Sequence, residues 1–95
     1  MEIRYPATVE AQSDGRFLVQ FVDLPDLFTE GETKEEALFD ASEVLSAMLA
    51  WRLDEAKHVP APSLQVKGAV YIEPDAKTQA AMHLRFARGD RSLSE

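Results

Sequence analysis

The sequence contains no cysteine, no long apolar run, and only four glycines and two histidines in 95 residues. The lack of cysteine excludes a disulfide framework, thiolate zinc sites and a cysteine nucleophile, and it suits a reducing compartment. No stretch reaches the roughly eighteen apolar residues of a membrane span, and no signal-peptide core follows Met1. These absences favour a cytoplasmic protein without a membrane partner.

Residues that commonly hold metals, nucleotides or phosphates are also scarce. His58 and His83 are far apart, with none of the spacings typical of zinc sites around them, and there is no glycine-rich phosphate loop. We interpret both histidines as helix-surface residues and expect no metal and no cofactor.

The charge is strongly negative, because seventeen acidic side chains face ten Lys and Arg, for a net charge of −7. Residues 1–68 hold thirteen of the acidic and six of the basic side chains. Such a segment repels phosphates and attracts basic partners, so we do not expect it to bind nucleic acid directly. The alternative is that the acidity only keeps the protein soluble.

At 95 residues, with 45% apolar and 28% charged residues, the chain is a soluble domain with one modest core and not a multi-domain enzyme. Alternating apolar residues predict strands over residues 3–12, 17–21 and 27–30, the first two joined as a hairpin by Ser13-Asp14-Gly15. Residues 69–72 are short and apolar, which predicts a central or fully covered fourth strand.

Two helices are expected. Thr33 and Glu36 have the spacing of a capping box, and an apolar stripe predicts a helix from there to about Lys57, before Pro60. Phe39 and Trp51 fall off this stripe, so one of them is expected to be exposed or to pack on a strand edge, and for Trp51 side packing is favoured over an exposed contact surface. The second helix is expected over about fourteen residues after Pro74, with these residues on its apolar side: Ala80, Ala81, Leu84 and Ala87.

These elements indicate an α+β fold, a mainly antiparallel sheet covered by one long helix, with a further helix at the C-terminal side. In this order of elements the chain resembles the HicB-type antitoxins of bacterial type II toxin–antitoxin pairs. The residues that carry the resemblance lie between positions 3 and 63: Tyr5-Pro6-Ala7, Asp14-Gly15, the stretch from Val22 to Gly31, Thr33 with Glu35-Glu36-Ala37, and Pro60 with Pro62-Ser63.

The resemblance implies a partial ribonuclease H-like β-β-β-α-β domain over residues 1–73. Such a domain masks a small basic toxin of the HicA type, which cleaves messenger RNA, and is not itself an enzyme. Family members also repress their own operon through a C-terminal DNA-binding region, here residues 74–95, which would be a C-terminal helix and the incomplete start of a helix-turn-helix.

The helix-turn-helix is expected to be incomplete because four residues after Arg91 cannot form its second helix. We therefore expect no operator binding by residues 1–95. Arg85, Arg88 and Arg91 are weak candidates for DNA contacts, and we interpret them as residues that suit a helix C-terminus. The modest core and leftover apolar residues such as Trp51 favour a homodimer or a higher oligomer.

The densest acidic cluster is the candidate toxin-binding site, and it comprises Asp23, Asp26, Glu30 and Glu32. These carboxylates would pair with Arg and Lys of a basic toxin; alternatively, they are solvated loop charges. Within this stretch, Asp26 stands where the family usually has glycine after Leu24-Pro25. A type II turn needs positive φ at this position, so either aspartate adopts it at some cost or the turn has changed type.

Two other functions remain as alternatives. One is a metal-dependent nuclease that would use Glu10, Asp14, Asp23 and Glu30 with magnesium, although the middle of the first strand lacks the carboxylate that this chemistry usually needs. The other is a scaffold of this fold with a different partner. No residue is assigned a catalytic role.

Overall fold

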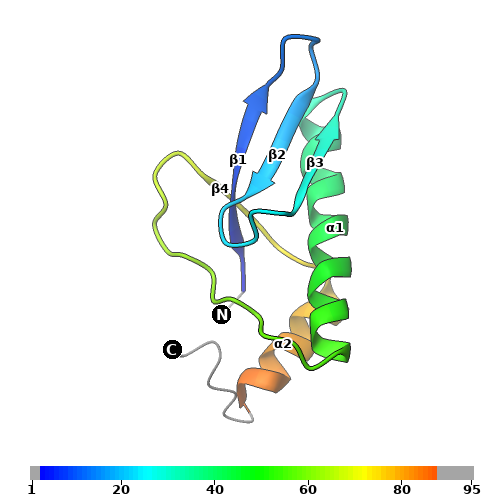
Figure 1. Cartoon of the computed structure of the whole chain (residues 1–95), viewed down its shortest axis with the longest axis vertical. Helices are drawn as coiled ribbons and strands as arrows, with labels where there is room; N and C mark the ends of the chain where they lie inside the picture. Colours follow the sequence, from blue (N-terminus) through cyan, green and yellow to red (C-terminus); the bar gives the residue numbers. More distant parts are fainter. Residues whose placement is uncertain (1–2, 88–95) are drawn as a thin grey trace.

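The computed structural model describes residues 3–87, which form a four-stranded sheet and two helices (Figure 1). The elements are β1 (Tyr5–Ala11), β2 (Phe17–Phe21), β3 (Phe28–Gly31), α1 (Lys34–Asp54), β4 (Val70–Ile72) and α2 (Ala76–Ala87). This confirms the α+β fold with an antiparallel sheet and one long helix. The narrower description as ribonuclease H-like stays a prediction.

The strands follow the order β3-β2-β1-β4, and every neighbouring pair is antiparallel. The hairpin between β1 and β2 is confirmed, with Ala7 opposite Phe21 and a turn in which Gly15 takes φ 88°. The prediction of a central or fully covered β4 was wrong, because β4 is an edge strand and Tyr71 is half-buried. Three apolar residues indicate partial cover but do not reveal how many strands lie beside them.

The start of α1 is fixed by side chains and by close packing. The Thr33 hydroxyl accepts the Glu36 N–H at 3.0 Å, and the Glu36 carboxylate accepts the Glu32 N–H at 2.8 Å, one residue upstream of the usual capping-box partner. Gly31 is needed for space and not for its φ, since a Cβ there would lie 2.6 Å from the Ala37 nitrogen. The first turn of α1 can therefore pack directly on the end of β3.

The end of α1 falls three residues earlier than the predicted Lys57. Ala56 adopts a left-handed conformation with φ 54°, and the Lys57 N–H donates to the Arg52 carbonyl at 2.8 Å, which closes the last turn. The chain has thus already left the helical path before Pro60.

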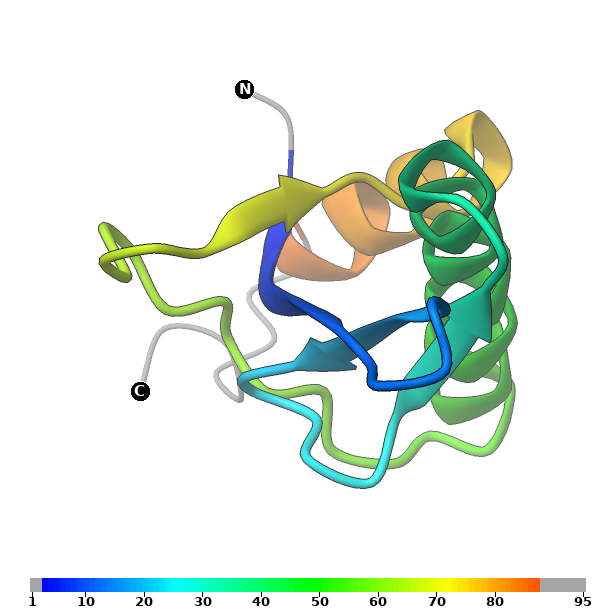
Figure 2. The same cartoon turned by 90° about the horizontal axis from the view of Figure 1, so that it is seen from above.

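The core lies between α1 and one face of the sheet (Figure 2). Tyr5, Ala7 and Val19 are fully buried there, and Phe21 is 1% exposed. The helix contributes the buried residues Ala37, Ala41, Leu45, Ser46 and Leu49. On its opposite side Phe39 and Trp51 are 67% and 50% exposed, so both are exposed and the side packing favoured for Trp51 was wrong. The sheet lies on the other side of α1 and cannot cover them (Figure 2).

Helix α2 closes the lower end of the core. Its predicted apolar side was wrong, because Leu84 is 54% exposed and the buried residues are Thr78, Gln79 and Met82. The Gln79 side chain pairs with the backbone of Ile3 through two hydrogen bonds of 3.0 and 2.6 Å. This long-range contact between α2 and the chain before β1 leaves no trace in local periodicity.

The remaining segment, residues 55–69, is called the connector and passes from the end of α1 around to the other side of the sheet (Figures 1 and 2). The Tyr5 hydroxyl donates to the Pro60 carbonyl at 2.7 Å. The Tyr71 hydroxyl accepts the Val66 N–H at 2.9 Å and donates to the Ser63 carbonyl at 3.2 Å. Side chains of β1 and β4 thus fix the path of the connector.

Candidate partner-binding surface

The sheet has a second face that α1 does not cover, and its upper part is free of the connector as well (Figure 1). We call it the open face. Because side chains alternate along a strand and opposite residues share a face, the register assigns these residues to its upper part: Thr8, Glu10, Leu18, Gln20, Phe28 and Glu30. Val22, the first residue after β2, continues this alternation. Phe28 is 58% exposed and Val22 is 39% exposed.

Two of the predicted acidic residues lie on or beside this face, next to one arginine. The Arg16 guanidinium is 3.7 Å from the Glu30 carboxylate and 3.8 Å from that of Glu32, and all three side chains are well exposed. Exposed pairs at such distances contribute at most about 1 kcal/mol. A cation of a partner can therefore compete with Arg16 for both carboxylates.

Asp23 has an internal role instead. Its two carboxylate oxygens accept hydrogen bonds from the Ser63 N–H at 2.8 Å and from the Ser63 hydroxyl at 2.6 Å. This contact ties the β2–β3 loop, residues 22–27, to the connector. Burial, together with the nearby Asp23 charge, raises the pKa of the Tyr5 hydroxyl well above its usual range, which keeps it protonated as a donor to Pro60.

Asp26 lies at the exposed tip of the same loop. The Leu27 N–H donates to the Leu24 carbonyl at 2.8 Å, which closes a four-residue turn around Pro25 and Asp26. Asp26 does not have positive φ; outside glycine, the described residues with positive φ are Ala56 and Gln65. Of the two alternatives for the missing glycine, the turn has therefore changed type. The buried Leu24 and Leu27 direct the tip outward.

The candidate DNA-contacting arginines are only partly described. Arg85 lies near the end of α2, is half-buried and donates to the Lys57 carbonyl at 3.2 Å. Arg88 and Arg91 fall outside the described residues, as does the expected second helix of the helix-turn-helix. The domain division at residue 73 also stays a prediction, although Met82 of α2 belongs to the same buried cluster as the sheet.

The four acids of the nuclease alternative do not converge. Glu10 and Glu30 lie on either side of Leu18, two strand spacings or about 10 Å apart. Asp14 accepts the Arg16 N–H in the hairpin turn, and Asp23 is bonded to Ser63. Among residues 3–87 there is no group of three or more His, Asp or Glu that could hold a metal ion.

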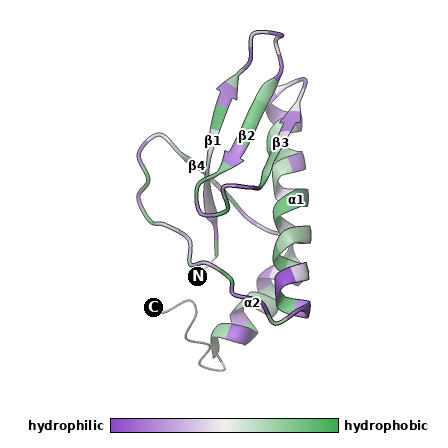
Figure 3. Cartoon of the chain, in the orientation of Figure 1, coloured by the Kyte–Doolittle hydropathy of each residue, from purple (hydrophilic) through white to green (hydrophobic). Residues whose placement is uncertain are grey.

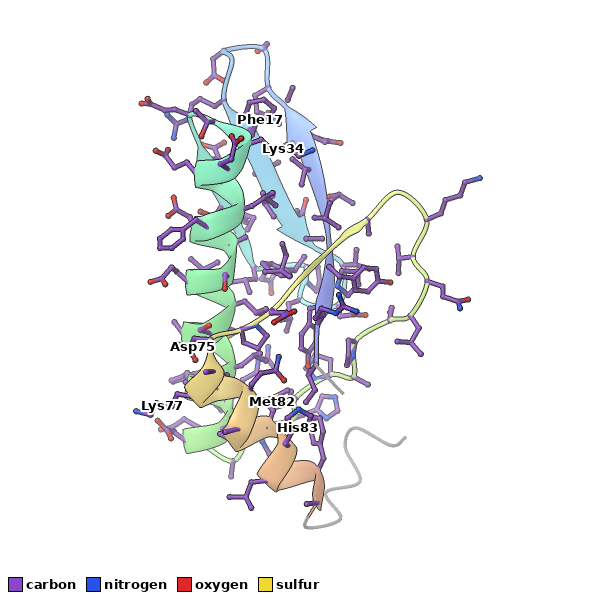
Figure 4. The ribbon with its side chains drawn as sticks, turned by 180° about the vertical axis from the view of Figure 1, so that it is seen from behind. Phe17, Lys34, Asp75, Lys77, Met82 and His83 are labelled. Carbon is purple, nitrogen blue, oxygen red and sulfur yellow. The ribbon has the colours of Figure 1, made fainter. Side chains whose placement is uncertain are left out.

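The lower end of the open side carries a hollow of about 670 Å³ between the connector, β4 and α2. It is lined by Ile3, Arg4, Pro62, Leu64, Gln65, Tyr71, His83 and Phe86. His83 of α2 is exposed (Figure 4). His58, beyond the end of α1, is exposed as well, in agreement with the interpretation of both as surface residues. No helix within the described part of the chain is long and apolar enough to cross a membrane.

Sequence reasoning missed the apolar part of the open face. The signal for it is present in β2, where Leu18 stands between two core residues and gives the strand apolar side chains on both faces. A strand that covers one core and faces water on the other side normally alternates. Phe28, opposite Gln20, was counted only as part of the third strand.

A family model described as HicB-like antitoxin of bacterial toxin-antitoxin system matches residues 4–81. The chain belongs to this family. The match spans β1 to β4, α1 and the first half of α2, so it includes every residue assigned to the open face.

Three curated relatives of this HicB-like chain illustrate the match. Antitoxin HicB 1 of Photorhabdus laumondii is 35% identical over 60 residues, which are 63% of this chain and 39% of the relative. Antitoxin HicB of Escherichia coli K12 is 34% identical over 61 residues, 64% of this chain and 44% of the relative. Antitoxin HicB 2 of Photorhabdus laumondii is 33% identical over 82 residues, 86% of this chain and 57% of the relative. The aligned part of the HicB-like chain thus spans between two fifths and three fifths of these proteins.

Proposed function

We propose that this HicB-like protein is an antitoxin that binds an RNA-cleaving toxin of the HicA type and covers its RNA-binding surface, without catalysing a reaction itself. The observation that carries the proposal is the family match over residues 4–81. The names of the relatives, all called antitoxins, support the same role.

The electrostatics of the chain favour such a partner. A protein that cleaves RNA needs cationic side chains to bind the phosphates, and a surface with a net charge of −7 attracts them over several ångströms. Asp26, Glu30 and Glu32 are the exposed carboxylates that we assign to this contact. Asp23 supports it indirectly, since its bonds to Ser63 hold the loop that carries Asp26.

Masking also agrees with the arrangement of the acids. An inhibitor that acts by steric masking needs an interface of about 1,200–2,000 Å² in total, and it needs no catalytic group. The scattered positions of Glu10, Asp14, Asp23 and Glu30 give no support to the nuclease alternative.

The direct test mixes this chain with a purified toxin of the HicA type and follows the cleavage of a labelled RNA. We expect cleavage to fall in proportion to the antitoxin added and to stop near the stoichiometry of the complex seen by size-exclusion chromatography with light scattering. The chain alone, with RNA and magnesium, should leave the RNA intact. Undiminished cleavage with an excess of this chain would contradict the proposal, and magnesium-dependent cleavage lost on Asp23→Asn would favour the nuclease.

Repression of the operon is proposed only for a protein with a complete C-terminal DNA-binding region. Residues 1–95 by themselves should not shift operator DNA in a gel. The same light-scattering measurement on the free chain tests the proposed homodimer or higher oligomer.

A further inference from the structure

Two surfaces among the described residues expose more than one large apolar side chain, and they differ in how well they could form the centre of a protein interface. The first is the outer side of α1, with Phe39 and Trp51. The second is the open face of the sheet, where Val22 and Phe28 are exposed and Leu18 is half-buried. The centre of an interface is a packed apolar cluster, and single exposed apolar residues are common on any surface.

On α1 the two aromatic side chains are isolated from each other. They are twelve residues apart, which corresponds to about 18 Å along a helix axis. The exposed Glu43 and Ala47 lie between them, and the Lys57 ammonium sits over the Trp51 ring at 5.3 Å from its centroid. Trp51 therefore already has a cation of its own chain on one face of its ring.

On the open face the apolar side chains are neighbours. Phe28 stands opposite Gln20 and diagonal to Leu18, at separations of about 5 and 7 Å for such pairs in a sheet. Val22, the first residue after β2, lies opposite Pro6, to whose carbonyl its N–H donates at 3.0 Å, and so it continues the face of Gln20. The Asp23–Ser63 contact brings the connector, with the 81% exposed Leu64, against this end of the sheet. The apolar area thus continues downward along the open side.

Carboxylates border this apolar area. Leu18 has Glu10 opposite it on β1 and Glu30 opposite it on β3, and both carboxylates belong to exposed residues. In Figure 3 the hydrophobic upper part of β2 lies between hydrophilic ends of β1 and β3. An apolar centre with an acidic border complements a partner surface that has an apolar centre and a cationic border.

We infer that the open face, with Phe28 and Leu18 at its centre and Glu10 and Glu30 at its border, is the surface that docks on the cationic RNA-binding surface of the toxin. This inference rests on the proposed function and specifies its site. The strands hold these side chains in place before the partner arrives, so little ordering entropy is lost on binding. The outer side of α1 stays in contact with solvent in the complex.

The test compares matched substitutions on the two surfaces by measuring the Kd for the purified toxin in isothermal titration calorimetry. Phe28→Ala should raise Kd by about 30-fold or more, as for a central aromatic contact. Phe39→Ala, which removes an equally exposed phenyl ring from α1, should change Kd by less than about 3-fold. Both variants should keep the urea midpoint of the wild type, because neither ring is in the core.

A charge pair gives a second measurement that needs no loss of apolar packing. Glu10→Arg should slow association with the toxin about 10-fold at low salt, and the difference should shrink as salt is added. Glu43→Arg, an exposed position on α1, is the matched control and should have a clearly smaller effect.

The outcomes separate the inference from the proposed function. If wild type binds the toxin and the α1 variants weaken binding while the open-face variants do not, the inference is wrong and the antitoxin role stands. If wild type neither binds the toxin nor protects RNA, both are wrong. If only Phe28→Ala and Glu10→Arg weaken binding to the toxin, the result supports both the inference and the antitoxin role.

Discussion

The two faces of the sheet are made by the same strands, yet they differ in almost every respect. On the covered face Val19 and Phe21 are buried against α1, whereas on the open face Phe28 keeps more than half of its surface in water. Each strand contributes alternate residues to the two faces, so neighbours in sequence have different roles. The residues that stabilise the fold and the residues of the proposed docking surface are therefore different residues of one small sheet, and we expect that each set can be changed independently.

The sharpest way to break this comparison is to remove one phenyl ring from each face. Phe21→Ala should lower the free energy of unfolding by about 3–5 kcal/mol, since it leaves a cavity under α1. Phe28→Ala should change it by no more than about 0.5 kcal/mol. Urea denaturation followed by circular dichroism measures both. Equal losses would mean that the open face is part of the folding core.

A second prediction concerns the covered face at its junction with α1. Gly31→Ala should lower the free energy of unfolding by about 1–3 kcal/mol. Its Cβ would lie 2.6 Å from the Ala37 backbone nitrogen and push the first turn of α1 off the sheet. Gly15→Asn is the control, at a position with open space and positive φ, where asparagine is tolerated. If both substitutions are equally mild, the helix is not packed against β3 as described.

A third prediction concerns the lower border of the open face. Asp23→Ala removes both hydrogen bonds to Ser63 and should cost about 1–2 kcal/mol, while Ser63→Ala removes only the one to its hydroxyl and should cost less. Hydrogen exchange at the Ser63 amide should accelerate in Asp23→Ala. An unchanged exchange rate would show that the connector is held without this contact.

The smallest effect on stability is expected at the start of α2, a helix that belongs to neither face of the sheet. The Thr78 N–H and hydroxyl donate to the Asp75 carboxylate, which lowers the pKa of Asp75 below the usual 3.8. Because the pKa of Asp75 is lower in the folded than in the unfolded protein, the ionised carboxylate adds to the free energy of unfolding above about pH 3.8. This stabilisation is lost as the pH falls through the folded pKa. An NMR titration should show the Thr78 amide shifting with Asp75 in this range. The Asp75→Asn variant should lose that pH dependence. A Thr78 amide shift that does not change with pH in the wild type would contradict the hydrogen bonds between Thr78 and Asp75.

Features set by neighbours in sequence were predictable. The hairpin follows from Ser13-Asp14-Gly15, and the start of α1 follows from Thr33 and Glu36, because turn and cap hydrogen bonds join residues at most four positions apart. The alternation in β1 and β2 similarly gave the covered face. Each of these signals is a local one, in which backbone geometry depends on a few adjacent side chains.

Features set by distant partners were not predictable. Asp23 looked like a free loop charge because its partner Ser63 is forty positions away, and Gln79 was not expected to be buried because its partner Ile3 is still farther along the chain. The toxin-binding role of the acidic cluster stays a prediction, and the sequence did not separate Asp23, which is bonded to Ser63, from the exposed Asp26. The exposure of Phe39 and Trp51 depends on what packs against α1, which no local pattern contains.

The strand order has a consequence for synthesis on the ribosome. β1 is made first but lies inside the sheet, and its hydrogen bonds to β4 must wait until residue 72 has been translated. The residues of the open face are all present once residue 30 has emerged, and α1 follows with only two residues between it and β3. The nascent chain can therefore display its docking side while one edge of its first strand is still unpaired.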